Sequence, residues 1–551
     1  MRVVLRRKGT HRRPPNGTTG EHSRAFQRRD TQMRHRYLTV ALLLVAVAIL
    51  PATAGAPPSR VPANVLVFGT NTADIVSLDP AQAFEFTGVW VNYHVYDTLV
   101  DFSRDFSRVV PRLASSWTAS PDLRTYTFTL RPATFHSGAP VTAEAVVFSI
   151  QRVFALKMAP SFLVTDFIKA PTDVVAVSAG QLRVTFSQPM PEMLMAAVFG
   201  NPVTGVVDPA LVRRNATADD PQANKWLTAN SAGSGPYVLR GWTRNLKIEL
   251  VAFDNYWKGR PRMGRIFIQD MPEATAQLLA LQQGDIDVAM NLLPGQLKQI
   301  AATPGFQVKQ TPTFTIRYLT MNVGFAPFAK KEVRNAVKYA LDYEAYKRIY
   351  EDTIDPGQTI VPAGMFAHLK DRPYSRNLDR ARALMREGGY EQGFNAELMV
   401  PIDPILPNVA AKMKEDLAQI RINVDVKVLR NADILGIYRA QRHQMAIQRW
   451  GADYPDPANL ATAFADFDSR VLAWRNQWDH PVKAKVKQAV QERDPAKRAA
   501  LYAEIQKTVL EEGPYAIFAY PLRMNAMRTN VKGVDPSPLY ETYDLSNATK
   551  E

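Results

Sequence analysis

The sequence predicts an α/β protein that folds into at least two lobes. Its composition, with 46% hydrophobic and 22% charged residues, is that of a globular chain rather than of a disordered tail or a fibre. Its 551 residues exceed the ~250–300 that one hydrophobic core usually holds, so more than one core is expected. A strand–helix–strand order within residues 397–429 predicts parallel strand pairing, which is typical of α/β folds.

The chain begins with a pattern typical of export. Residues 1–32 are rich in arginine and lack apolar periodicity, and we interpret them as an extension from a misassigned start codon. Residues 33–56 combine a basic start, an apolar run over 37–50 and small residues, which predicts a signal peptide cleaved after Ala54 or Ala56. The alternative is a membrane anchor, but the run has about 14 residues where a span needs ~20.

The basic charge of the chain is concentrated at its start. Residues 1–54 hold eleven basic and two acidic residues, which leaves 56 basic and 50 acidic residues for the remainder. The exported part therefore carries only about +6 of the net +15, an ordinary surface charge. This distribution gives no support to a nucleic-acid partner.

The absence of cysteine excludes several kinds of chemistry. With no cysteine, the chain has no disulfide, no thiolate metal site and no cysteine nucleophile. It also lacks the cysteine that carries the lipid of a bacterial lipoprotein. An exported, cysteine-free chain with no later apolar run of ~18 residues is expected to be a soluble periplasmic protein.

The first half of the exported chain shows mostly strand patterns. Alternating side chains predict a strand over Arg124–Leu130, and a helix is expected from residue 143 through Phe154, with Thr142 as its N-cap. Residues 233–236 (GSGP) predict a β-turn rather than a phosphate-binding loop, because proline follows where helical N–H groups should begin. Further strands are expected over Val65–Thr70, Tyr237–Leu239 and Lys247–Ala252.

The second half alternates helices and strands. Residues Lys330–Arg348 predict one helix with an apolar face, and Leu378–Arg386 predict another. A strand (397–400), a helix (409–420) and a strand (424–429) then follow. This order predicts an α/β lobe with some parallel strand pairing.

The motifs of common enzymes and metal sites are missing. The sequence contains no GxSxG, HExxH or GxxxxGK[ST] pattern. Five histidines follow the signal peptide, and none has metal-ligand spacing to another. We therefore expect a protein that is not an enzyme, with no catalytic residue, no metal and no cofactor.

Several short motifs follow one another over nearly all of 62–540. The first are LASSW, PDLRTYTFTLR, FHSG and VTAEAVVFS over residues 113–149. The later ones are GSGPYVLRGW (233–242), FDNYWKGRP (253–261), LLALQQGDIDV (278–288), RYLTMNV (317–323), KKEVRNAVKYALD (330–342), WGADYPDPANL (450–460) and NVKGV (530–534). Together and in this order, these motifs resemble the large periplasmic solute-binding proteins of ABC importers. This family, extracellular solute-binding protein family 5, includes dipeptide-, oligopeptide- and nickel-binding members.

The resemblance implies a two-lobed periplasmic binding protein fold that closes on its ligand like a clamshell. A large extra subdomain is inserted in the first lobe. We expect lobe I over 62–310, lobe II over 311–512 and a return to lobe I over 513–551. The chain would cross between lobes near 306–316 and again near 508–518. Ligand binding would shift a hinge equilibrium, with no bond made or broken.

The resemblance also implies ligand-binding residues. Peptide-binding members pair the ligand's α-ammonium with an aspartate just after the tryptophan of the ligand loop, which here is Asp453. Asp–Pro turn chemistry alone is the alternative explanation for that segment. Trp450 and Tyr454 could stack on the ligand or belong to the core, and so could Trp90 and Tyr93 of the first-lobe pocket segment.

One position departs from the family pattern. Dipeptide-binding members place an arginine for the ligand's carboxylate shortly before the helix expected at 409–420, but this chain has Asp403 in that segment. A carboxylate there would repel a peptide C-terminus. Longer peptides, a cationic compound or another amine-bearing solute therefore stay open as ligands.

The expected function is that of a solute-binding component of an ABC importer, with peptides as the expected solute. It would act as a monomer and deliver its solute to an inner-membrane permease complex. The same fold with a non-peptide solute, such as an opine, a sugar derivative or a metal chelate, is the main alternative. A secreted enzyme or a chaperone on this scaffold is a third.

Overall fold

The computed structural model describes residues 59–539 and 543–551, so the predicted extension 1–32 and signal peptide 33–56 lie outside the described residues. Within the described residues, no single helix has the length and apolarity to cross a membrane. Helix α3 (Ala143–Leu156) and the helical segment 159–165 that follows it have sufficient length and apolar composition only when they are taken together. The two segments are bent by 119° relative to each other.

The first lobe is built on strands that are brought together from distant parts of its sequence. Strand β1 pairs in parallel with β10, so that Val65 lies opposite Arg265, and β9 and β8 continue the sheet antiparallel. Its strands are β1 (Val65–Thr70), β8 (Tyr237–Thr243), β9 (Lys247–Ala252), β10 (Arg265–Asp270) and β11 (Val288–Ala289). Its helices are α2 (Phe86–Val95), α6 (Pro209–Asn215), α7 (Asn224–Leu227), α8 (Ala274–Gln283) and α9 (Pro294–Ala301).

A separate antiparallel sheet, in the order β4-β5-β7-β6, lies between β1 and β8 in the sequence. Its strands are β4 (Ala114–Ala119), β5 (Thr125–Leu130), β6 (Val174–Ser178) and β7 (Gln181–Thr185). Helix α3 packs on β6, and α4 (Phe162–Thr165) packs on α5 (Glu192–Phe199). A hairpin of β2 (Val100–Phe102) and β3 (Val109–Pro111) precedes this sheet. The strand expected at Arg124–Leu130 is confirmed as β5. Thr142 is the N-cap of α3, but its side chain makes no capping hydrogen bond.

The second lobe contains the predicted strand–helix–strand unit. Strands β15 (Phe394–Pro401) and β16 (Ile422–Leu429) pair in parallel around helix α14 (Leu406–Ala418). Val409, Met413 and Leu417 follow one another at four-residue spacing on α14 and are fully buried. The sheet continues through β17 (Met445–Gly451) and β13 (Thr315–Met321). The other helices are α10 (Ala326–Ala329), α11 (Lys331–Ala340), α12 (Tyr343–Ile349), α13 (Leu378–Glu387), α15 (Asn431–Arg439), α16 (Pro457–Ala465), α17 (Leu472–Arg475), α18 (Val482–Gln491) and α19 (Pro495–Glu512).

The single helix expected over Lys330–Arg348 is wrong, because the structure has two helices there. Helix α11 ends before Leu341, whose ψ of 137° is extended. The side chain of Asp342 then accepts a hydrogen bond from Ala345 N at 2.9 Å and begins α12. An aspartate that caps a new helix competes with continuation of the old one, which the apolar spacing alone did not show.

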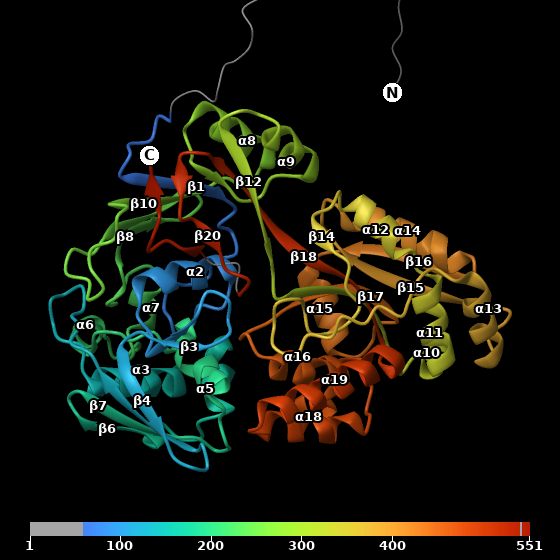
Figure 1. Cartoon of the computed structure of the whole chain (residues 1–551), viewed down its shortest axis with the longest axis horizontal. Helices are drawn as coiled ribbons and strands as arrows, with labels where there is room; N and C mark the ends of the chain where they lie inside the picture. Colours follow the sequence, from blue (N-terminus) through green and yellow to red (C-terminus); the bar gives the residue numbers. More distant parts are fainter. Residues whose placement is uncertain (1–58, 540–542) are drawn as a thin grey trace, which may run out of the picture. The chain divides into compact units, whose positions relative to one another are not determined.

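One long strand, β18 (Tyr515–Arg528), connects the two lobes (Figure 1). Its first half pairs with β13 of the second lobe, and residues 522–528 pair with β12 (Phe306–Pro312). The short β14 (Ile354–Asp355) pairs with its middle. One twelve-stranded sheet therefore runs through the molecule. The expected return to lobe I at residue 513 stays a prediction.

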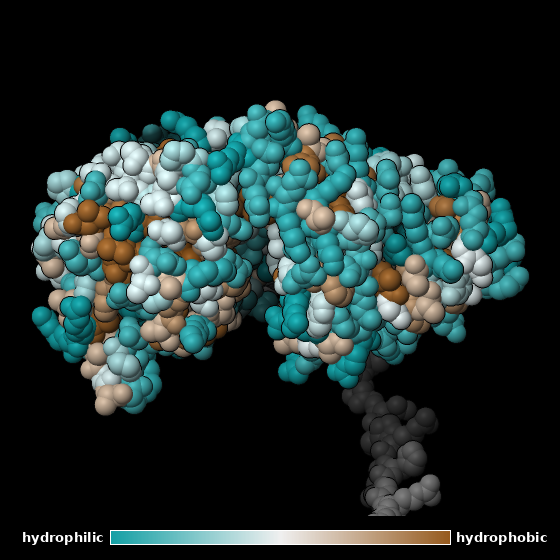
Figure 2. All heavy atoms as spheres, turned by 90° about the horizontal axis from the view of Figure 1, so that it is seen from below, coloured by the Kyte–Doolittle hydropathy of each residue, from teal (hydrophilic) through white to brown (hydrophobic). Residues whose placement is uncertain are grey.

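The C-terminal segment packs against the first lobe with four short strands. Their bounds are β19 (Val531–Lys532), β20 (Asp535–Pro536), β21 (Tyr543–Asp544) and β22 (Thr549–Lys550). Lys550 forms a buried ion pair with Asp287, with 2.7 Å between Nζ and Oδ1. Hydrophilic residues dominate the face shown in Figure 2, and hydrophobic residues form small separate groups there.

The GSGP segment packs against the end of α2. Gly235 N donates a hydrogen bond to Val95 O at 3.0 Å. A Cβ at Gly233 would lie 2.0 Å from the same carbonyl oxygen, so only glycine fits this approach. No helix begins at this segment, and β8 follows directly, which agrees with a turn rather than a phosphate loop.

Candidate functional site

A cavity of about 1020 Å³ is lined by residues of both lobes. The first-lobe wall includes Phe84 and residues from α4 and its C-terminal end, while the second-lobe wall comes from β13, β17 and α15–α17. Four of the predicted site residues line it, namely Asp403, Trp450, Asp453 and Tyr454. Ligand pockets usually have about 300–1,000 Å³, so this cavity suits a solute of several linked groups.

The loop that follows β17 is held by a buried ion pair. Asp456 is the N-cap of α16 and accepts a hydrogen bond from Ala458 N at 2.9 Å. The guanidinium of Arg498, on α19, donates two hydrogen bonds to the Asp456 carboxylate at 2.7 and 2.8 Å. Both side chains are almost completely buried. The loop therefore has a fixed anchor at its C-terminal end.

Asn459 organises the part of the loop that contains Asp453. Its Nδ2 donates to Asp453 Oδ2 at 3.0 Å, and its Oδ1 accepts hydrogen bonds from Asp453 N and Trp450 Nε1, both at 3.2 Å. Burial raises the pKa of Asp453 to about 6, and the hydrogen bond from Asn459 opposes that rise. Asp453 is thus a desolvated carboxylate that faces the cavity and is positioned by a neighbouring amide.

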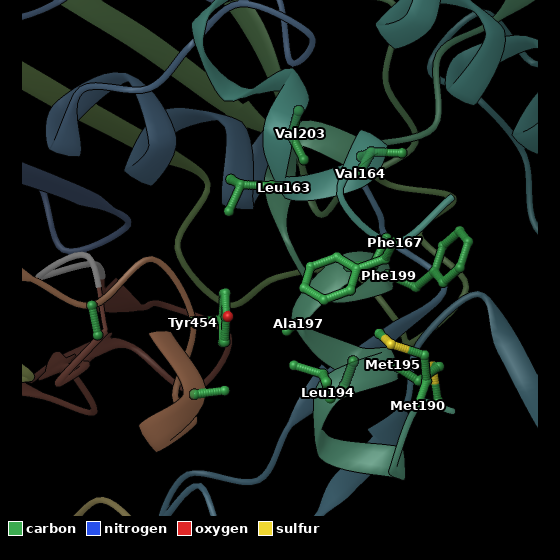
Figure 3. Packing of buried hydrophobic residues seen from close by; sticks show 14 of the residues in the cluster. Leu163, Val164, Phe167, Met190, Leu194, Met195, Ala197, Phe199, Val203 and Tyr454 are labelled. Carbon is green, nitrogen blue, oxygen red and sulfur yellow. The ribbon is translucent and has the colours of Figure 1, made fainter. Parts of the chain in front are cut away.

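The aromatic residues of the loop belong both to the core and to the cavity wall. Tyr454 is 8% exposed, and its ring lies 6.5 Å from that of Phe167 in the first lobe. Figure 3 shows it beside Phe167 and Ala197. Trp450 packs edge-on against Phe464 at 6.4 Å and is partly buried. Packing in the core and a position on the cavity wall are therefore compatible for Trp450 and Tyr454. Their contact with ligand stays a prediction.

Asp403 is paired with an arginine that the sequence did not single out. Its Oδ1 accepts hydrogen bonds from Ile405 N and Leu406 N, at 2.8 and 3.0 Å, where α14 begins. Its Oδ2 lies 3.5 Å from the guanidinium of Arg317, a cavity-lining residue of β13. The positive charge of Arg317 therefore offsets the repulsion that Asp403 was expected to exert on a peptide C-terminus. Arg317 reaches this part of the cavity from β13 rather than from the segment before α14.

Trp90 is a core residue of the first lobe. It is 2% exposed, and its ring contacts those of Phe68 and Tyr543 at 5.0 and 5.1 Å. It lines a separate pocket of about 300 Å³ and is not among the residues that line the cavity around Asp453. Its contact with ligand stays a prediction.

Tyr93 lies on the wall of a smaller cavity of about 220 Å³. Its Oη donates a hydrogen bond to Asp101 Oδ2 at 2.7 Å, and the guanidinium of Arg112 lies 4.8 Å from its ring centre. Asp453 and Tyr454 line this cavity as well as the larger one. The smaller cavity thus adjoins the loop that contains Asp453, and a role for Tyr93 in binding stays a prediction.

Within residues 59–539 and 543–551, no group of three or more histidine and acidic side chains could hold a metal ion. The cavity is instead lined by charged groups of both signs. Its acidic residues include Asp166 and Asp453, and its basic residues are Arg317, Arg439, Arg449 and Arg475. This arrangement can bind an organic solute that carries both an ammonium and an anionic group.

Comparison with known proteins places the chain in a family. The pattern of the bacterial extracellular solute-binding proteins, family 5 (middle region), matches residues 108–469. The probable D,D-dipeptide-binding periplasmic protein DdpA of Escherichia coli K12 is 28% identical over 502 residues, which cover 89% of this chain and 95% of DdpA.

Solved structures show the same fold. DppA from Helicobacter pylori, in complex with the peptide STSA, has a TM-score of 0.75 at 23% identity. The match covers 88% of this chain and 98% of the DppA chain. AgaA from A. tumefaciens R10, in complex with agropinic acid, has a TM-score of 0.72 at 25% identity. The match covers 88% of this chain and 99% of the AgaA chain. The predicted two-lobed periplasmic binding protein fold is confirmed. The chain belongs to the bacterial extracellular solute-binding proteins of family 5.

Proposed function

We propose that this protein captures peptides between its lobes and delivers them to an inner-membrane ABC permease. The observation that carries the proposal is the cavity that places the desolvated Asp453 and the guanidinium of Arg317 on its walls. A peptide has an ammonium for Asp453, and its carboxylate can be met by the arginines of the cavity wall. The relative DdpA is named for a D,D-dipeptide, and H. pylori DppA was solved with the peptide STSA, which supports peptide as the cargo.

Binding is coupled to closure because side chains of one lobe reach the other. Asn201 Nδ2, in the first lobe, donates a hydrogen bond to Asp453 O at 3.3 Å. Arg493 in the second lobe donates to Pro121 O and Asp122 O at 2.9 and 3.0 Å. A hinge opening would break these contacts, and a ligand that bridges the lobes favours the closed state. The protein thus acts by shifting the equilibrium between its open and closed forms, and no bond is made or broken.

The cellular setting follows from the same assignment. The signal peptide over 33–56 directs export and is cleaved, and the mature protein acts in the periplasm as a monomer. The permease recognises the closed form, so an empty, open protein does not compete for it.

The cargo can be identified by mass spectrometry of small molecules that are released when the purified mature protein is denatured. We expect a set of peptides with free N-termini, because the carboxylate of Asp453 lines the cavity and would pair with a bound ammonium. The control is the Asp453→Asn protein purified in parallel, which should release much less of the same masses. A single non-peptide mass, such as an opine, would contradict the peptide assignment and leave the fold assignment intact.

The affinity for an amine-bearing peptide should fall as the pH drops below about 6. The pKa of Asp453 is raised to about 6 by burial, and a bound ammonium would lower it because it favours the ionised carboxylate. Protonated Asp453 must therefore lose its proton before it pairs, which weakens binding by up to about tenfold per pH unit below that pKa. Partial burial also raises the pKa of Asp166 on the same cavity wall, so it acts in the same direction.

Titration calorimetry with trialanine between about pH 5 and about pH 8 measures this dependence. At about pH 7 the affinity should reach its maximum, since Asp453 is then ionised in both states and the α-amine of trialanine, with a pKa of ~8, is still mostly protonated. The Asp453→Asn protein should lack the slope. An affinity of the unmodified protein that stays constant over the whole range would contradict the assignment of Asp453 to the ammonium.

A further inference from the structure

Two arginines meet on the second-lobe wall of the cavity. Arg439 is the last residue of α15 and Arg475 is the last residue of α17, and both line the cavity. The guanidinium of Arg475 lies 5.7 Å from the ring centre of Tyr438, the buried residue that precedes Arg439. The guanidinium of Arg475 therefore lies over Tyr438, and Arg439 follows this tyrosine at the end of α15.

Neither guanidinium has a counter-ion in the part of the chain that the structure describes. No ion pair and no side-chain hydrogen bond joins either of them to another residue there. Burial lowers the pKa of Arg475, Tyr438 raises it, and the positive charge of Arg439 lowers it again. Arg317, on the same wall, differs because Asp403 balances its charge.

The nearby acidic residues are occupied by other groups. Asp468 accepts hydrogen bonds from Lys483 Nζ at 3.3 Å and from Lys487 Nζ at 2.6 Å. Asp466 accepts a hydrogen bond from Asp468 N at 3.0 Å and caps the short turn that follows it. Arg439 and Arg475 repel each other, and a ligand that supplies negative charge between them would relieve this repulsion.

We infer that Arg439 and Arg475 form an anion subsite that takes a carboxylate of the solute. Paired guanidiniums bind carboxylates through short, charge-assisted hydrogen bonds with fixed geometry. The inference rests on the proposed function and narrows its substrate class to amine-bearing solutes with a carboxylate placed for this subsite. In a peptide, that carboxylate belongs to an acidic side chain or to the C-terminus.

The test measures the affinity of three synthetic peptides by calorimetry: Ala-Glu-Ala, Ala-Gln-Ala and the C-terminal amide of Ala-Gln-Ala. If the subsite takes a side chain, Ala-Glu-Ala binds on the order of 10- to 100-fold more tightly than Ala-Gln-Ala. If it takes the C-terminus, amidation weakens binding by a similar factor. In both cases the ratio of the two affinities should fall toward one in the Arg439→Gln and Arg475→Gln proteins. A ratio that stays the same in both variants would overturn the inference. So would equal affinities of the unmodified protein for all three peptides.

Two further measurements keep the result interpretable. Arg439 is exposed, so Arg439→Gln should fold normally, and a thermal unfolding curve checks this for both variants. The matched control is Arg442→Gln, an exposed arginine that does not line the cavity and should leave all three affinities unchanged.

Glutarate, a dicarboxylate without an amine, tests the subsite when no peptide binds. Failure of all three peptides would refute the proposed peptide function. The subsite is then supported if millimolar glutarate raises the Tm of the unmodified protein but not of the Arg439→Gln and Arg475→Gln proteins. Absence of a shift in the unmodified protein would overturn it.

Discussion

Replacing Asp453 by asparagine is expected to weaken binding of an amine-bearing peptide by about 100-fold or more. Removal of one partner of a buried charge pair typically costs ~3–5 kcal/mol, and each 1.4 kcal/mol is a factor of ten in Kd. Asparagine has nearly the same shape and can keep a hydrogen bond with Asn459, so the loop should retain its conformation. The loss would then report on charge rather than on folding.

The stability of the Asp453→Asn protein should not fall. Burial raises the pKa of Asp453 to about 6, so the ionised carboxylate costs free energy in the empty protein at neutral pH. Calorimetry with trialanine measures the affinity, and thermal unfolding measures the stability. Asp371→Asn, at an exposed position outside the cavity, is the matched control. Unchanged affinity in Asp453→Asn would remove Asp453 from the site.

Replacing Arg498 by methionine is expected to lower the free energy of unfolding by ~3–5 kcal/mol. Arg498 is 5% exposed and donates two hydrogen bonds to Asp456, one to Ala489 O at 3.1 Å and one to Tyr502 Oη at 3.1 Å. Methionine leaves the carboxylate of Asp456, which is 2% exposed, without its counter-ion. The ligand loop should loosen at the same time, because Asp456 is its anchor.

Urea unfolding checks this prediction through a lower midpoint concentration. Lys497→Met is the matched control, because Lys497 is exposed and precedes Arg498 on α19. The double variant Arg498→Met with Asp456→Asn should recover part of the loss, since asparagine removes the unpaired charge and still caps α16. A loss below about 1 kcal/mol in Arg498→Met would show that solvent replaces the guanidinium.

Local patterns in the sequence predicted most elements of the fold. Alternation and apolar spacing indicated β1, β5, α14 and the parallel pair β15 and β16, because these signals depend only on neighbouring residues. The helix over Lys330–Arg348 failed at Asp342, where a capping hydrogen bond decides the outcome. Spacing of apolar residues does not register such a bond.

Part of the candidate site could be predicted from a local sequence pattern, and part of it depends on the tertiary structure. The ligand loop with Asp453, Trp450 and Tyr454 is one continuous segment, so a sequence motif could identify it. Asn459 and Arg498 could not be assigned a role, because their partners are known only once the loop, α16 and α19 are folded together.

By itself, the sequence determined that this is a cysteine-free chain with the order of segments of a family, and it predicted an exported α/β protein, since composition and local pattern are properties of the chain alone. Only the tertiary structure decided the charge balance of the cavity. Arg317 meets Asp403 across 86 positions of sequence, and Arg439 and Arg475, at the ends of two different helices, line the same cavity. Electrostatic interactions depend on distance in space and on burial, and neither is encoded in the spacing of residues along the chain.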